Sequence, residues 1–269
     1  AVLAGIIAQL LEDKLGHIGP FQGAVALTAL ALVLILGWEE NYGEANEGDH
    51  ESSSLYKQFV DGWKATVTDS TIWRIGLTQA LSEGAMYTFV FMWVPTLLDT
   101  DPPGGVPTGC VFSSLMMAIT MGGMMFPVFH GVVSKCMGRS GKSSELTASL
   151  TYALASACMA IPASCLSASS ESSVCFTKIL TSFVIVEFSV GLFNPVAGTL
   201  RSKYVPDNLQ GGILNIFRLP LNAVVVAGTF ATDVLPTYQV YWIVSGCFMA
   251  AAVLQSTLII SGDKKAKKD

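Results

Sequence analysis

The chain has 269 residues, of which 51% are hydrophobic and only 13% are charged, and its formal net charge is −5. Soluble domains carry about 25% charged residues, so this composition predicts an all-α integral membrane protein, with apolar runs longer than barrel strands need. The negative charge argues against nucleic acid as a partner.

The sequence also lacks the usual signs of catalysis. Its six cysteines show no CxxC spacing, so we expect no metal site. No catalytic triad, phosphate loop or HExxH motif is present. We therefore expect neither enzyme activity nor a cofactor.

The first elements of the chain are two apolar runs and a long polar segment. Residues 1–11 are too few to cross a bilayer, so we expect them to be the second half of a helix whose first half is missing. Residues 18–37 predict a complete span. In the polar segment 38–70, apolar side chains recur every four positions, at Leu55, Phe59, Trp63 and Val67. This spacing predicts an amphipathic helix on the membrane surface, and a flexible linker is the alternative.

The rest of the chain predicts six further spans, which are joined by short connections rich in turn residues. We place them at residues 71–98, 108–134, 146–167, 174–200, 208–232 and 237–261. Residues 262–269 form a basic tail. Lysine and arginine gather in the connections on the same side as this tail, so the C-terminus is predicted to be cytoplasmic.

Three ionisable residues, Arg218, Glu83 and Glu187, interrupt the apolar spans near their midpoints. At ~1.5 Å per residue, all three fall within about one turn of the middle of a ~30 Å apolar layer. A charge there costs roughly 2.5–3.5 kcal/mol and usually marks a functional site. We therefore predict that the three side chains face one another across a water-accessible cavity.

Two roles for these charges remain open. In the functional interpretation, Arg218 binds an anionic substrate, and Glu83 or Glu187 takes up a proton or releases Arg218 when the substrate arrives. In the structural alternative, Arg218 pairs permanently with a glutamate and fixes helix packing. Neutral groups at similar depths are further candidates for substrate binding, namely Gln79, Tyr87, Asn194, Asn215 and Asn222.

A connection between two spans resembles a known loop signature. The segment GVVSKCMGRS, residues 131–140, is similar to the GxxxDxxGR[K/R] loop of the major facilitator superfamily, in which it takes part in gating. Gly131, Gly138 and Arg139 match this pattern. Lys135 stands where the family has aspartate, and Ser140 stands where it has a final basic residue.

Longer stretches resemble one branch of that superfamily, the molybdate-anion transporters. They are GWEENYGE (37–44), LTQALSEGAMYTFVFMWVPTLLD (77–99), CVFSSLMMA (110–118) and VEFSVGLFNPVAGTLRSKYVPDNLQGGILNIFRLPLN (186–222). The resemblance implies that residues 1–37 are the end of helix 5 and helix 6 of an N-terminal bundle. It further implies that 38–70 is the central cytoplasmic loop, 71–261 the C-terminal six-helix bundle and 262–269 a cytoplasmic tail.

The same resemblance implies a function. The chain would be part of a secondary carrier for an oxyanion, molybdate first of all, with tungstate and sulfate left open. Its partners would be membrane lipid, the oxyanion and the N-terminal half of the same fold. The alternative is a half-transporter that serves as a structural membrane subunit, without transport, beside other membrane subunits.

Overall fold

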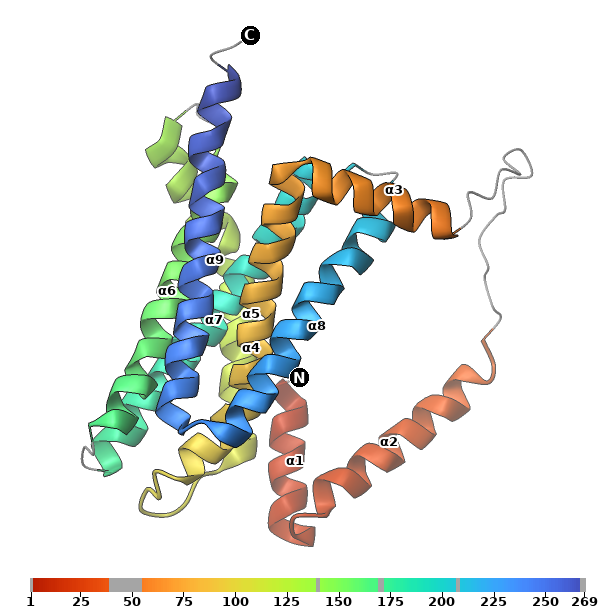
Figure 1. Ribbon diagram of the computed structural model, residues 1–269. Coiled ribbons are helices and arrows are strands. Elements are labelled where there is room, and N and C mark those ends of the chain that lie inside the picture. Colours follow the sequence, from red (N-terminus) through yellow and green to blue (C-terminus); the bar gives the residue numbers. More distant parts are fainter. Residues whose placement is uncertain (1, 39–54, 139–140, 169–171, 207–208, 267–269) are drawn as a thin grey trace.

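The computed structural model describes residues 2–38, 55–138, 141–168, 172–206 and 209–266, and within them the chain is helical, without strands (Figure 1). This confirms the predicted all-α class. The helices are α1 (Val2–Leu15), α2 (Gly19–Ile35), α3 (Leu55–Thr68), α4 (Ser70–Leu98), α5 (Thr108–Met137), α6 (Ser143–Ser167), α7 (Ser172–Tyr204), α8 (Gln210–Val234) and α9 (Thr237–Ala266).

Five of the described helices, α5 to α9, are long and apolar enough to cross a membrane, where the sequence predicted seven complete spans. The other two predicted spans, residues 18–37 and 71–98, correspond to α2 and α4, which do not belong to this group. Helix α2 is apolar but has 17 residues, fewer than the ~20 that a bilayer core requires. Helix α4 has 29 residues and carries Arg74, Gln79 and Glu83, and it is not among the helices that are apolar enough along a membrane-length stretch.

Helices α4 to α9 form one bundle, in which α6 packs against α7 and α9, α5 against α7, and α4 against α8 and α9. Aromatic side chains fill its centre. The ring centroids of Phe89 and Phe183 are 4.9 Å apart, and those of Phe183 and Tyr241 are 5.8 Å apart. Helix α7 is the most deeply buried of the membrane-length helices, so it fixes the positions of its neighbours.

Helices α6 and α9 are joined by hydroxyl groups that bond to the backbone of the opposite helix. Ser156 Oγ donates to the Ser245 carbonyl oxygen at 2.9 Å, and Ser245 Oγ donates to that of Ser156 at 2.8 Å. Further along the pair, Ser149 Oγ donates to the Ala252 carbonyl oxygen at 2.9 Å. Small hydroxyl residues of this kind allow close approach and hydrogen bonding between membrane helices. We call this contact the serine seam.

Helix α1 lies against the first turns of α5. Gly5 and Gly109 bring the two backbones together, because a Cβ at Gly5 would meet the Gly109 carbonyl oxygen at 2.7 Å. The Gly109 N–H donates to Gln9 Oε1 at 2.9 Å, and Ser113 Oγ donates to the Val2 carbonyl oxygen at 2.9 Å. Helix α2 packs on α1 and then diverges from the bundle, with its apolar side chains exposed (Figure 1).

Residues 55–68 of the polar segment form α3, which crosses the N-terminal end of α8 and packs on it and on α4 (Figure 1). Gly62 lies against Gly212 and Ile213 of α8. The apolar side chains of Phe59, Trp63 and Val67 remain exposed. Their contact with a membrane surface stays a prediction.

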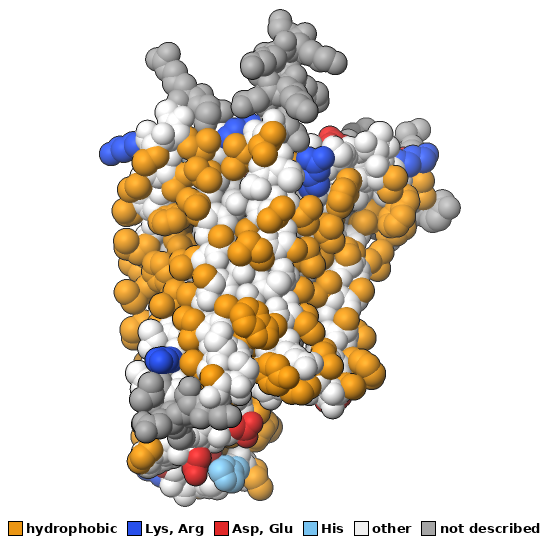
Figure 2. Space-filling model, turned by 60° about the vertical axis from the view of Figure 1, so that its left-hand side comes forward, with side chains coloured by type: hydrophobic (Ala, Val, Ile, Leu, Met, Phe, Trp, Pro, Cys, Tyr) orange, Lys and Arg blue, Asp and Glu red, His pale blue; other side chains and the backbone are white. Residues whose placement is uncertain are grey.

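The outer surface has the distribution of side chains that a membrane protein requires. Figure 2 shows hydrophobic side chains covering the flank of this face, with most of the visible Lys and Arg towards the end where α9 terminates and most of the visible Asp and Glu towards the opposite end. Exposed apolar residues on the membrane-length helices include Val128, Leu150, Val226, Phe230 and Val253. Together with the apolar helices, this surface identifies an integral, multi-pass membrane protein.

Candidate functional site

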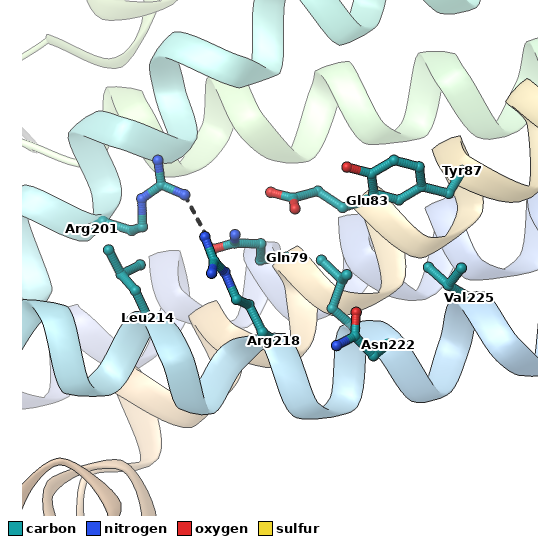
Figure 3. Close-up of a pocket in the computed structure, with 9 residues that line it drawn as sticks. Gln79, Glu83, Tyr87, Arg201, Leu214, Arg218, Asn222 and Val225 are labelled. Atoms are coloured by element: carbon teal, nitrogen blue, oxygen red, sulfur yellow. Dashed lines mark hydrogen bonds between the residues drawn. The ribbon is translucent and has the colours of Figure 1, made fainter. Parts of the chain in front are cut away.

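A cavity of about 620 Å³ lies between α4, α7 and α8 and carries most of the polar groups that the sequence singled out (Figure 3). It is only partly enclosed. Its walls are formed by Gln79, Glu83, Tyr87, Arg201, Leu214, Arg218, Leu221, Asn222 and Val225.

Helical spacing explains why two of the walls are polar. Gln79, Glu83 and Tyr87 follow one another at intervals of four on α4, so they lie one above the other on the same face. On α8, Arg218 and Asn222 are also four residues apart and face the same cavity. The polar residues of α4 and those of α8 therefore face each other where the two helices lie side by side.

Glycines on α4 hold α8 close on either side of the charged residues. A Cβ at Gly76 would lie within 3.0 Å of the Phe217 ring, and one at Gly84 would lie 2.8 Å from Val224 Cβ. Because Phe217 and Val224 flank Arg218 along α8, these two contacts fix the height at which the Arg218 guanidinium enters the cavity.

The charges in the cavity are not paired with one another at short range. Arg201 Nη1 donates to Gln79 Oε1 at 3.2 Å. In the described part of the chain, the ion pairs within 4.0 Å involve Glu12 and Glu145, not Glu83, and Arg218 makes no hydrogen bond. The permanent Arg218–glutamate pair of the structural alternative is therefore absent from the residues described.

The structure brings two of the three predicted intramembrane charges together, and not the third. Glu83 and Arg218 line the same cavity, whereas Glu187 does not, and only 3% of its surface is exposed. The prediction used depth along the helix, which says nothing about direction around it. Glu187 lies within the most buried helix, where its side chain is surrounded by protein.

Of the neutral residues that we predicted to bind substrate, some line the cavity and others do not. Gln79, Tyr87 and Asn222 line the cavity. Asn194 and Asn215 are exposed on α7 and α8 but are not part of its lining.

The signature loop lies at the end of α5. Gly131 and Lys135 belong to its last turns, and Lys135 is exposed. Gly138 ends the helix with φ of 60°, a conformation that suits glycine. Arg139 lies outside the described residues.

Two features of this end of the bundle were missed from sequence. Arg201 was counted as a charge in a connection, but α7 continues to Tyr204 and turns Arg201 into the cavity. Nearby, the fully buried Glu145 of α6 accepts from Lys203 Nζ at 2.7 Å and from the Tyr204 hydroxyl, with Lys142 Nζ at 3.6 Å. This cluster ties the start of α6 to the end of α7.

Among the described residues, no group of three His, Cys, Asp or Glu side chains is placed to hold a metal ion. The groups that line the cavity can bind a ligand by hydrogen bonds and charge. Two guanidinium groups, two amides and a phenol face it, and they can donate to an anion.

Comparisons with known proteins relate the chain to membrane transporters. A family model described as sugar transporters with 12 transmembrane segments (MFS_5) matches residues 1–188. The chain is 31% identical over 226 residues to a protein named molybdate-anion transporter from Xenopus laevis, an alignment that covers 82% of this chain and 46% of that protein. It is 28% identical over 260 residues to one of the same name from Danio rerio, covering 86% and 50%.

The chain thus spans about half the length of the curated relatives that it matches. No solved structure matches it significantly.

Proposed function

We propose that this chain, which belongs to the MFS_5 family of the major facilitator superfamily, forms part of a secondary carrier. The carrier moves an oxyanion, molybdate, across a membrane. The relatives named molybdate-anion transporter support this substrate, and so does the chemistry of the cavity between α4, α7 and α8.

The main support for the proposal is that Arg218 faces the cavity without a hydrogen bond to the described residues. Its guanidinium lines a wide cavity without a hydrogen bond to the described part of the chain, although it stands in the middle of a membrane-length helix. Placing a charge there is costly, and packing alone does not require a guanidinium that makes no hydrogen bond to the described residues. A ligand that brings negative charge would supply the partner.

A tetrahedral oxyanion suits the groups that face it. The planar guanidinium presents parallel N–H groups that can bond two oxygens of one anion, which an ammonium does less well. The Asn222 amide and the Tyr87 hydroxyl line the same cavity and can donate to the remaining oxygens. With a volume of about 620 Å³, the cavity has room for such an anion and its water.

Glu83 is the carboxylate that we assign to coupling. It lines the cavity, whereas Glu187 does not. An entering anion is repelled by an ionised Glu83, so protonation of this carboxylate favours binding. Transport would then take up a proton together with the anion.

The other half of the fold is the partner that this arrangement requires. The described cavity has walls from α4, α7 and α8 and is only partly enclosed by them. In alternating access, a second bundle faces the first across the substrate and rocks against it. The greater length of the relatives supports such a bundle.

We also propose that the C-terminus lies in the cytoplasm. Lys and Arg gather on the face shown in Figure 2 towards the end where α9 terminates, which is the side that the positive-inside rule assigns to the cytoplasm. The alternative role, a structural membrane subunit without transport, has no support from relatives that carry transporter names.

Uptake of labelled molybdate by cells that express the complete protein tests the proposal. Arg218→Ala removes the guanidinium, and we expect the apparent affinity to fall about 10- to 100-fold, as for the loss of a charged hydrogen bond. Arg218→Lys should impair uptake as well, because the planar fork is lost.

The matched control is Lys178→Gln, which removes a charge from an exposed position near the other end of α7. It should transport like the unmodified protein. Normal molybdate uptake by Arg218→Ala, at equal amounts in the membrane, would refute the assignment of the site.

A further inference from the structure

The cavity contains a second guanidinium that faces the first. Arg201 comes from α7 and Arg218 from α8, and the two side chains point towards each other across the cavity in Figure 3. Glu83 is the carboxylate that shares the lining with them. The cavity therefore carries two positive charges against one negative charge, or two against none when Glu83 is protonated.

The orientation of Arg201 is set by α4. Its Nη1 donates to Gln79 Oε1 at 3.2 Å, and Gln79 is neutral, so this hydrogen bond directs the guanidinium without cancelling its charge. A carboxylate at the same position would have formed an ion pair. Gln79 is thus a positioning residue that keeps Arg201 available.

Two like charges that face one cavity repel each other, and an apolar surrounding strengthens that repulsion. A monoanion can neutralise one of them. A dianion neutralises both at once and can accept hydrogen bonds from both guanidinium groups on different oxygens.

From this geometry we infer that Arg201 is the residue that makes the site selective for doubly charged tetrahedral oxyanions over singly charged ones of the same shape. The inference rests on the proposed function, since it concerns the same cavity, and it adds what that proposal leaves open. Arg218, with its neutral neighbours, accounts for anion binding, whereas Arg201 accounts for the preference for doubly charged anions.

A structural role for Arg201 makes a different prediction. If its bond to Gln79 served only to pack α4 against α7, its loss would lower stability and weaken every ligand alike. Selectivity between two anions of equal shape is therefore the readout that separates the two roles.

Tungstate and perrhenate provide this comparison, because both are tetrahedral oxyanions of nearly equal size and differ by one charge. Binding of each is measured by its competition with labelled molybdate on the complete protein in lipid nanodiscs. We expect the unmodified protein to prefer tungstate. Arg201→Gln should weaken tungstate binding about 10-fold or more, as for a lost charged hydrogen bond, and perrhenate binding much less.

Two further variants complete the test. Arg201→Lys keeps the charge and should keep tungstate ahead of perrhenate, although both bind less well. Lys178→Gln removes a charge from the same helix outside the cavity and should leave both affinities unchanged.

The outcomes distinguish the two proposals. If the unmodified protein binds neither anion, the proposed function fails. If it prefers tungstate and Arg201→Gln weakens both anions by the same factor, the proposed function survives and the role of Arg201 in selectivity is refuted.

Discussion

The crossing of α5 and α7 offers a direct test of how this bundle is held together. At Gly191 of α7, an added Cβ would lie 2.8 Å from the backbone nitrogen of Gly123 and 2.9 Å from the carbonyl carbon of Ile119. Real Cβ atoms essentially never come nearer than 3.0 Å to such atoms, and backbone cannot rotate aside as a flexible side chain does. Gly191→Ala must therefore move α5 away from α7.

The size of the effect follows from two opposing contributions. Overpacking of this kind costs about 1–3 kcal/mol, and we expect the upper end because Gly122 on α5 makes the reciprocal contact with the backbone of Phe188. Alanine also favours a helix over glycine by ~1 kcal/mol. The net loss in free energy of unfolding should be about 2 kcal/mol.

Unfolding of the purified protein in mixed micelles, titrated with a denaturing detergent, measures this loss. Gly198→Ala is the matched control, because Gly198 lies on the same helix and a Cβ there meets nothing within 4 Å. It should be as stable as the unmodified protein or slightly more so. Equal stability of Gly191→Ala and Gly198→Ala would refute the close contact between α5 and α7.

Two other contacts give predictions of their own. Glu145→Gln removes the charge that Lys203 Nζ contacts at 2.7 Å, and it should lower the free energy of unfolding by about 1–3 kcal/mol in the same titration. The loss should be smaller than for a wholly buried pair, because 37% of the Lys203 side chain is exposed. An unchanged midpoint would refute the role of this cluster. Gly5→Val should separate α1 from α5 and so speed hydrogen exchange of the Gly109 amide, which donates to Gln9; unchanged exchange would contradict that contact.

The architecture followed from sequence because apolar runs and turn residues are local signals. The helix ends at Leu98, Ser167 and Val234 lie within about two residues of the ends that we predicted, which is the usual uncertainty of such boundaries. The four-residue spacing on α4 also indicated in advance that Gln79, Glu83 and Tyr87 share a face.

The site was harder to predict, because its parts come from three helices. Depth along a helix can be counted from sequence, but the direction in which a residue faces depends on what packs beside it. For this reason we predicted Glu187 to face the cavity, whereas it does not line it. Arg201 was missed for a related reason: we ended its helix at residue 200, whereas α7 continues by one turn to Tyr204. The pairing of Glu145 with Lys203 joins residues 58 positions apart and has no local signal.

The serine seam has a practical consequence for measuring movement in this protein. Because Ser156 and Ser245 each hold the backbone of the opposite helix, α6 and α9 cannot slide past one another without breaking both bonds. Spectroscopic labels at the exposed positions Leu154 and Val253 would keep a constant separation and serve as a stationary reference. The displacement of α8 on addition of an anion can be timed against it.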